Sequence, residues 1–343
     1  MSYKVAAAQV APAFLDLAGS VAIAERWIAE AGAAGVKLVV FPEAWLPGYP
    51  VWLDNAPAAA AWGSPDGKAL YRRLFDNSPT LDCPEIAQIC AAAKRAGVFV
   101  IMGMNEKDGR TLYNTLLYIS EDGVITGKHR KLVPTYTERL IHGMGDGSTL
   151  TVVDSPTLGK VGGLVCWEHW MPLARQAMHG KHEVVHAAVW PTVSDLHQLG
   201  SRSYAFEGRT FVVAVGSVLR RAHLPPPGTF ALLDAMPGDQ FQSGGSAVIG
   251  PDGSYLAGPA GDEEGLVIAE VDPARCTEEL MTLDVSGHYA RPDVFHLHVD
   301  ERERQLLTTT ATATATAAAE AGTYGAHAAG VGRGQGPDLA PRL

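Results

Sequence analysis

Two apolar runs of this chain end in residues that could do chemistry. The run 37–41 is followed two residues later by Glu43, and the run 161–165 is followed directly by Cys166. In α/β proteins, ligands bind at the carboxyl ends of buried strands. A carboxylate beside Trp45 would be partly desolvated, which raises its pKa toward the range that suits a general base. Glu43 is therefore a candidate base, and Cys166 is a candidate nucleophile.

A third candidate lies in the stretch GKHRKLVPTYTER, residues 127–139, where the basic positions Lys128 to Lys131 are followed by Glu138. A cation beside Cys166 would favour the thiolate and could stabilise negative charge on a tetrahedral intermediate. Each of these features also has an ordinary interpretation. A cysteine after an apolar strand is usually a small core residue, a glutamate there is usually solvated, and a basic run is usually a solvated face.

The segment HEVVH, residues 182–186, fits the H-E-x-x-H pattern of zinc peptidases, with Glu207 as a conceivable third ligand. Such a site needs both histidines on one helical face, ~5–6 Å apart. On a strand the same pair would be separated by roughly 13 Å, too far to share one zinc ion. The run 184–190 is rich in β-formers and is followed by Pro191, which predicts a strand. Zinc peptidase stays as a remote alternative at this point.

The elements that would position these residues alternate between strands and helices. Helical patterns cover 17–34 and 84–96, and the second begins with a proline and ends at Gly97. Thr111–Ser120, followed by Asp-Gly and Val-Ile, predicts a hairpin. An α/β fold with a mixed sheet is therefore expected. The expected strands are Lys4–Val10, Lys37–Phe41, Val98–Met104, Thr111–Ser120, Thr149–Val153, Val161–Cys166, Val184–Trp190, Phe211–Val218, Gly245–Gly250 and Leu266–Val271.

Composition limits the classes of function. The 343 residues are 47% hydrophobic and carry a net charge of −10, which argues against a nucleic-acid partner. No apolar run approaches the ~18 residues of a membrane span, and no signal peptide is visible at Met1. Four scattered cysteines do not form a disulfide framework, and we assign Cys83, Cys90 and Cys276 to packing. A cytoplasmic enzyme is expected.

The chain changes character near its end. Residues 307–343 are Thr/Ala-rich and then Gly/Pro-rich, with too few large apolar side chains to offset the entropy of ordering. We therefore expect a single domain over residues 1–300 and a disordered, low-complexity tail over residues 301–343.

Taken together, these motifs resemble the nitrilase superfamily (the carbon–nitrogen hydrolases) and, within it, the nitrilase branch. The resemblance rests on FPEAWLPGYP at 41–50, HRKLVPTYTER at 129–139 and VCWEHWMPLARQAM at 165–178. Supporting matches are GDGS at 145–148, HAAVWPT at 186–192, EGRTFVVAVGS at 207–217, SGGSAVIGPDG at 243–253 and GHYARPDVF at 287–295. These blocks follow the family's order over about residues 4 to 298, and they place HAAVW on a strand.

The resemblance implies a four-layer αββα sandwich that pairs to αββααββα in a dimer, with assembly into spirals or filaments. It implies Glu43 as the base, Lys131 as the cation at the intermediate, Cys166 as the nucleophile and Glu138 as a supporting glutamate. No cofactor or metal is expected. The implied reaction converts a nitrile to an acid and ammonia through a thioimidate and an acyl-enzyme, with some amide as by-product.

The substrate pocket and the branch are less closely defined. We expect an apolar cavity for an aryl, arylaliphatic or medium aliphatic nitrile. Its expected lining is Tyr49, Trp52, Tyr136, Trp167 and Trp190. His142 stands where family nitrilases commonly carry an aromatic residue, often Trp, so the substrate range and the assembly are open. The alternatives are an amidase or carbamoyl hydrolase with the same Glu-Lys-Cys site, and a non-catalytic, filament-forming member.

Overall fold

Two six-stranded mixed sheets form the centre of residues 1–303, which make up one contact unit. The structure is a computed structural model that describes residues 1–305 and 307. The tail expected over 301–343 falls mainly on residues 306 and 308–343, which lie outside the described residues.

The first sheet has the strand order β14-β1-β2-β3-β4-β5. Its central strands β1, β2 and β3 are parallel, and β4, β5 and β14 pair antiparallel at the two edges. The expected hairpin is the β4–β5 pair. The bounds are β1 (Tyr3–Gln9), β2 (Val36–Val40), β3 (Phe99–Asp108), β4 (Thr111–Ile119), β5 (Ile125–Arg130) and β14 (Gly265–Val271).

The second sheet has the order β13-β12-β9-β8-β7-β6, again with a parallel centre, β7-β8-β9, and antiparallel edges. The central strand β8 is buried along its whole length. The bounds are β6 (Val152–Ser155), β7 (Gly159–Val165), β8 (Val185–Val189), β9 (Phe211–Val215), β12 (Ala247–Ile249) and β13 (Tyr255–Ala257).

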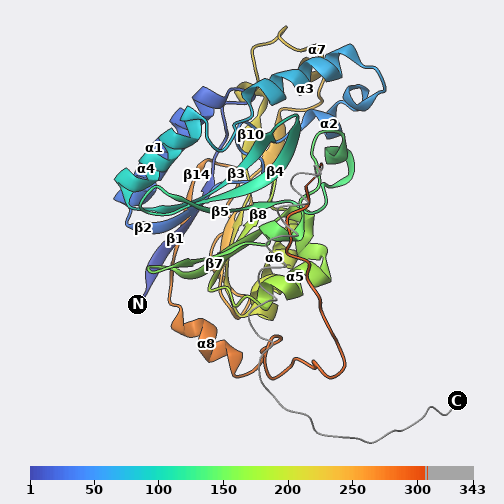
Figure 1. The fold of residues 1–343 in the computed structure, drawn as a ribbon. Helices are drawn as coiled ribbons and strands as arrows, with labels where there is room; N and C mark the ends of the chain where they lie inside the picture. Colours follow the sequence, from blue (N-terminus) through green and yellow to red (C-terminus); the bar gives the residue numbers. More distant parts are fainter. Residues whose placement is uncertain (306, 308–343) are drawn as a thin grey trace, which may run out of the picture. The chain divides into compact units, whose positions relative to one another are not determined.

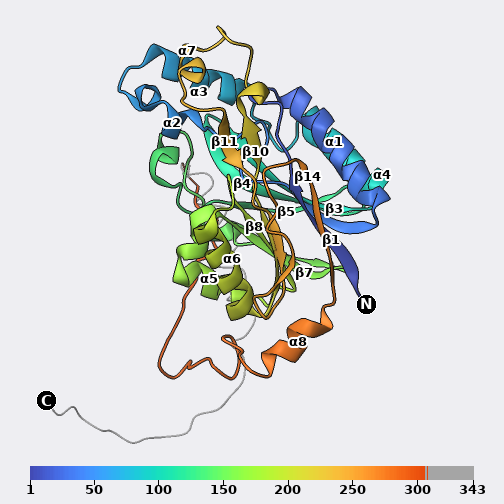
Figure 2. The same cartoon turned by 180° about the vertical axis from the view of Figure 1, so that it is seen from behind.

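Alternation along the strands divides the first sheet between two cores. Val5, Ala7, Leu38 and Val40 point toward the second sheet and pack in a core with its strands. Ala6, Ala8, Val39 and Phe41 point the other way and pack under helices α1 (Leu17–Ala33) and α4 (Pro84–Ala96). Because successive strand residues face opposite sides, one apolar run supplies both cores. Helices α5 (Pro172–His179) and α6 (Asp195–Gly208) pack on the other side of the sheets (Figures 1 and 2).

Shorter elements complete the unit. A ribbon of β10 (Val218–Arg220) and β11 (Gln240–Ser243) stands apart from both sheets. The short helices are α2 (Trp52–Asn55), α3 (Pro65–Asn77), α7 (Ala231–Asp234) and α8 (Ala274–Leu280), with 3-10 turns η1 (Pro57–Ala60), η2 (Tyr136–Leu140), η3 (Gly147–Thr149), η4 (Cys166–Trp170) and η5 (Arg221–His223). Among the described residues, no helix is long and apolar enough to cross a membrane.

Candidate active site

Glu43 lies in the turn that follows β2, where the backbone is held from β3. Ala44, the next residue, has a φ of +47°. The Asn105 side-chain amide of β3 donates hydrogen bonds to the carbonyls of Ala44 (3.1 Å), Leu46 (3.0 Å) and Gly48 (3.1 Å). One buried amide thus holds three carbonyl groups of the loop that presents Glu43, a residue that is only 1% exposed.

Lys131 follows β5 and is fully enclosed by carboxylates. Its ammonium donates to Glu43 Oε1 over 2.9 Å and to Glu138 Oε2 over 2.7 Å, and all three side chains are buried. Glu138 is held in turn by the Tyr49 hydroxyl, which donates to its Oε1 over 2.8 Å. Asn114 of β4 donates to Glu43 Oε1 over 2.7 Å. The Glu43 Oε2 atom is buried and has no nitrogen or oxygen donor within hydrogen-bonding distance among the described residues.

Cys166 comes directly after β7 and opens the 3-10 turn η4. Its φ of +53° is in the left-handed region, which side chains with a Cβ rarely adopt. Glu168 of the same turn accepts from the backbone N–H of Val165 (2.7 Å) and from that of Leu132 (2.7 Å). The Glu168 carboxylate therefore ties the residue before the cysteine to the residue after the lysine. The His129 ring holds it from the other side over 2.8 Å.

The electrostatics of this group depend on burial and on charge. Burial raises the pKa of Glu43 to about 7, with Lys131 acting in the opposite direction. Burial also raises the pKa of the Cys166 thiol well above its usual range; the charge of Glu43 adds to the rise, and Lys131 only partly opposes it. Burial disfavours the ammonium of Lys131, but the charges of Glu43, Cys166 and Glu138 outweigh it and raise its pKa.

The resting thiol is therefore neutral. Lys131 lowers the pKa of the thiol, as expected for a nearby cation, but burial and the charges of Glu43 and Glu138 outweigh this effect. A neutral thiol next to a carboxylate of pKa near 7 can lose its proton to that carboxylate as it attacks an electrophile.

A cavity of about 860 Å³ opens onto Cys166. Of the five expected pocket residues, Tyr49, Tyr136 and Trp167 line it. Trp52 and Trp190 do not, because both are packed in the interior, at 1% and 0% exposure. The lining is Tyr49, Asp54, Val133, Pro134, Thr135, Tyr136, Thr137, Glu138, Arg139, Cys166, Trp167, Trp170, Met171, Pro191, Thr192 and His197.

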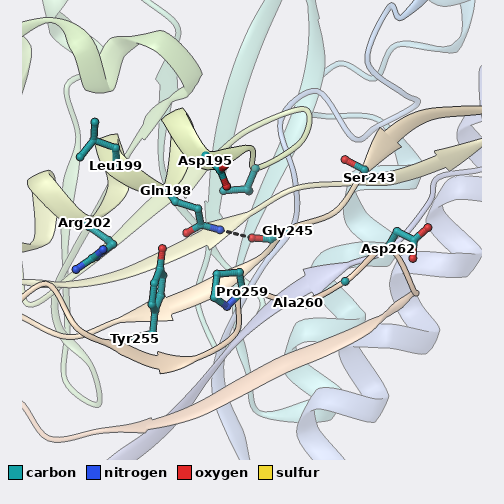
Figure 3. A pocket seen from close by; sticks show the side chains of 12 residues that line it. Asp195, Gln198, Leu199, Arg202, Ser243, Gly245, Tyr255, Pro259, Ala260 and Asp262 are labelled. Atoms are coloured by element: carbon teal, nitrogen blue, oxygen red, sulfur yellow. Dashed lines mark hydrogen bonds between the residues drawn. The ribbon is translucent and has the colours of Figure 1, made fainter.

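A second cavity, of about 580 Å³, lies over α6 and β13 (Figure 3). Asp195, Gln198, Arg202 and Tyr255 point toward it, and Gln198 is anchored by a 2.6 Å hydrogen bond to the carbonyl of Gly245. Its lining contains no cysteine or lysine, whereas the cavity described above is lined by Cys166.

The HEVVH segment does not have the geometry of a zinc site. His182 is exposed in a turn with a φ of +61°, and His186 is buried in β8, as the predicted strand requires. Within residues 1–305 and 307, no group of three or more His, Cys, Asp or Glu side chains could hold a metal ion.

Several side chains of the site were not predicted from the sequence. Asn105 and Asn114 lie inside strands and carry no local signal, whereas Glu168 was noted only as part of the Cys-Trp-Glu motif. His129 belongs to the basic run, but it is buried and bonded to Glu168 rather than solvated. Spacing alone could have suggested Glu168, because it lies two residues after the candidate nucleophile.

Comparison with known proteins supports the family resemblance that the sequence motifs indicated. The carbon-nitrogen hydrolase family matches residues 4–279. A bifunctional nitrilase/nitrile hydratase of Nicotiana tabacum is 38% identical over 300 residues, covering 85% of this chain and 84% of that protein. An aliphatic nitrilase of Rhodococcus rhodochrous is 38% identical over 317 residues, covering 88% of this chain and 83% of that protein. In fold, the chain is similar to the NitFhit protein of C. elegans, with a TM-score of 0.66 at 19% identity, over 89% of this chain and 69% of that one.

Proposed function

The chain belongs to the carbon–nitrogen hydrolase family (the nitrilase superfamily), and from this membership together with its site we infer that it is a nitrilase. It hydrolyses an organic nitrile to the carboxylic acid and ammonia. Curated nitrilases align over most of its length, among them nitrilase 1 of Arabidopsis thaliana, which is 36% identical over 87% of the chain. The single observation that carries the proposal is the buried Cys166 thiol, which lies at an apolar cavity and interacts electrostatically with Glu43 and the Lys131 ammonium.

In the first half of the proposed reaction, the Cys166 sulfur attacks the nitrile carbon. Glu43 takes the thiol proton and delivers it to the nitrile nitrogen, which gives a thioimidate. A nitrile carbon is a weak electrophile, so a sulfur nucleophile suits this step better than a hydroxyl. Lys131 is placed to stabilise the negative charge that develops on nitrogen during the attack. Glu138 and Tyr49 hold the ammonium in place.

In the second half, a water molecule that loses its proton to Glu43 adds to the thioimidate carbon. Expulsion of ammonia from the tetrahedral adduct leaves a thioester, and a second water releases the acid and restores the thiol. If the adduct expels the thiol in place of ammonia, the product is the amide. Partition at this adduct therefore sets the ratio of acid to amide.

The lining of the cavity supports an apolar substrate. Val133, Pro134, Trp170 and Met171 surround the approach to Cys166, and Trp167 is 55% exposed at the opening. We propose aryl, arylaliphatic or medium aliphatic nitriles as the substrate class, because burial of their apolar groups supplies the binding free energy. The reaction as written needs no cofactor or metal.

We propose assembly from dimers, on the αββααββα plan, through the helix layer α5/α6. This layer exposes large apolar side chains, whereas α1 and α4 expose none among the described residues. The exposed set is Leu173, Leu196, Leu199 and Phe206. Growth of dimers into spirals or filaments, and a cytoplasmic location in keeping with the four free cysteines, belong to the same proposal.

The first test is ammonia release and product identity with a panel of nitriles and their matching amides, on the wild type and on Cys166→Ala. Acid and ammonia from nitriles, lost in the variant, are the expected result. Cys90→Ala is the matched control, because Cys90 lies in α4 away from the cavity and should keep most of the turnover. Turnover of amides alone would move the chain to an amidase, and activity in Cys166→Ala would overturn the mechanism.

A further inference from the structure

The buried part of HEVVH forms a continuous line of hydrogen bonds that ends at Cys166. Tyr204 of α6 donates to Glu183 Oε2 over 2.5 Å, and Glu183 Oε1 and Oε2 lie 2.9 and 3.0 Å from His186 Nδ1. His186 Nε2 lies 3.1 Å from His169 Nε2, and His169 Nδ1 lies 2.7 Å from the Cys166 carbonyl oxygen. All of these side chains are buried, and none of them lines the cavity. Their chemistry is not used by the steps proposed above.

The donor and acceptor of each hydrogen bond can be assigned by starting from the Cys166 carbonyl. A backbone carbonyl only accepts, so His169 Nδ1 must carry a proton and donate to Cys166. Neutral His169 then accepts at Nε2, and His186 must donate from its own Nε2. Neutral His186 accepts at Nδ1, so the donor there is a protonated carboxyl of Glu183, whose other oxygen accepts from Tyr204. Every member of the line then has a partner without any buried net charge.

We propose that Glu183, His186 and His169 form a positioning chain, in which a neutral Glu183 carboxyl orients the two imidazoles so that His169 holds the carbonyl of Cys166. The Cys166 backbone has a φ of +53°, which persists only where the surroundings hold it. Glu168 fixes the Val165 N–H on one side of the cysteine, and the positioning chain fixes its carbonyl on the other. The thiol is thereby kept facing Glu43 and Lys131.

Burial and packing support the neutral form. Burial raises the pKa of Glu183 to about 8 and lowers the pKa of its partner His186 well below its usual range, so at neutral pH the proton belongs on the carboxyl. The rings are also held by stacking, with His186 on Tyr204 at 3.7 Å and His169 on Trp190 at 4.9 Å between ring centroids. Gly162 of β7 leaves the room for Glu183, because a methyl group there would overlap Glu183 Oε1.

The positioning chain acts on the nucleophile of the proposed nitrilase, and so it rests on that function. The test therefore includes a measurement that needs no nitrile. This is the rate at which iodoacetamide alkylates Cys166, followed by mass spectrometry so that Cys83, Cys90 and Cys276 are counted separately. The second measurement is kcat and KM on a nitrile that the wild type converts. Melting temperatures show which variants are folded.

Two variants break the positioning chain at its ends. His169→Phe keeps a ring but removes the donor to Cys166, and Glu183→Leu removes the group that orients His186. We expect kcat to fall about tenfold or more in both, with KM within about twofold, because a misplaced thiol affects the reacting geometry rather than binding. Alkylation of Cys166 should change in the same variants. If either variant fails to fold, His186→Phe replaces it, and the same fall in kcat and change in Cys166 alkylation are expected.

Glu183→Gln is the rescue. Its amide can donate to His186 Nδ1 and accept from Tyr204, as the neutral carboxyl does, so kcat and the alkylation rate should recover most of what Glu183→Leu loses. His179→Gln is the matched control: this histidine is buried against Tyr204, with ring centroids 4.5 Å apart, but makes no hydrogen bond within the positioning chain.

Wild-type kcat and alkylation in folded Glu183→Leu would overturn the proposal. If Glu183→Gln is as impaired as Glu183→Leu, the assignment of a neutral, proton-donating carboxyl to Glu183 is wrong. An equal loss in His179→Gln would show general damage to the interior, which also contradicts a specific chain. If the wild type converts no nitrile, the proposed function fails, while the alkylation rates still decide on the positioning chain.

Discussion

The protonation state of the Cys166 thiol depends on its burial and on the charges of Lys131 and the nearby carboxylates. From the sequence, Lys131 was expected to favour a thiolate. In the structure, Lys131 is bonded to both Glu43 and Glu138, and burial raises the pKa of the thiol. The resting enzyme therefore holds its proton on sulfur, and Glu43, with a pKa near 7, is the group that titrates in the working range. The pH dependence of activity should therefore follow the titration of Glu43 and not that of the thiol.

This gives a prediction for the pH profile. Glu43 accepts a proton only as a carboxylate, and burial raises its pKa to about 7, so the active form is lost as the pH falls below that value. We expect log kcat/KM to rise with a slope of about one up to about pH 7 and then to level off. A flat profile down to about pH 5 would contradict the assignment of Glu43 as the base.

Asn114→Leu is the control for that profile. Asn114 donates to Glu43 Oε1, and this hydrogen bond favours the ionised carboxylate and lowers its pKa. Its removal should therefore move the acid limb to higher pH, while the slope stays the same. A limb that does not move, or moves to lower pH, would show that another group controls it.

At the scale of elements, the strands that coincide with an apolar run were predictable and the others were not. The apolar runs matched β1, β2, β3, β4, β6, β7, β8, β9, β12 and β14 within a few residues. The three-residue strands β10 and β13 and the polar β11 have no alternation long enough to read. Of β5, only the start at Val124-Ile125 was expected, because its basic run looks like a solvated face.

The residues of the candidate site also divide into those that a local sequence pattern indicates and those that it does not. Glu43 and Cys166 were found because they terminate buried strands, and Lys131 because of a family resemblance. Asn105 and Asn114 could not be found, since a polar residue inside a strand gains its role only from the loop or side chain that folds against it. Trp52 and Trp190 were misplaced because aromatic residues near a site pack in the core as readily as they line a cavity.

The loop that carries Glu43 gives a prediction at this scale. His142 Nε2 lies 2.8 Å from Asn105 Oδ1, and burial lowers the pKa of His142 to about 4, so it is a neutral donor that fixes the amide. Asn105→Ala removes three hydrogen bonds to buried loop carbonyls, although those of Ala44 and Leu46 keep a backbone donor, and should destabilise the fold by on the order of 3 kcal/mol. His142→Phe removes one donor and should lose only about 1 kcal/mol.

Urea unfolding measures these free energies, and kcat measures the position of Glu43. We expect both to rank the wild type above His142→Phe and His142→Phe above Asn105→Ala. Asn77→Ala is the matched control and should keep wild-type kcat, because this half-buried asparagine bonds only the backbone of Arg73 and Leu17. The reverse ranking would mean that the loop is held by its own packing.

At the scale of the whole unit, the site is divided between the two sheets. Glu43 and Lys131 follow strands of the first sheet, whereas Cys166 follows β7 of the second. The core between the sheets joins them, and Leu38 and Val40 of β2 pack in the same core as Leu164 and Val165 of β7. Because interiors are close-packed, the sheets cannot slide without opening voids, so this core sets the distance between Glu43 and Cys166.

The helix layer α5/α6 gives the last prediction. Four side chains of this layer are between 47% and 71% exposed in one chain, and the proposed dimer would bury them: Leu173, Leu196, Leu199 and Phe206. A stable dimer buries ~1,200–2,000 Å², and its central apolar residues carry most of the binding free energy. Leu199→Glu would place a charge in that interface, and sedimentation should then show monomers at concentrations where the wild type is dimeric.

Val124→Glu, which replaces an apolar residue 56% exposed in the β4–β5 turn, is the control and should leave the dimer intact. Dimers that persist in Leu199→Glu but not in Val124→Glu would place the interface on the hairpin edge of the first sheet instead.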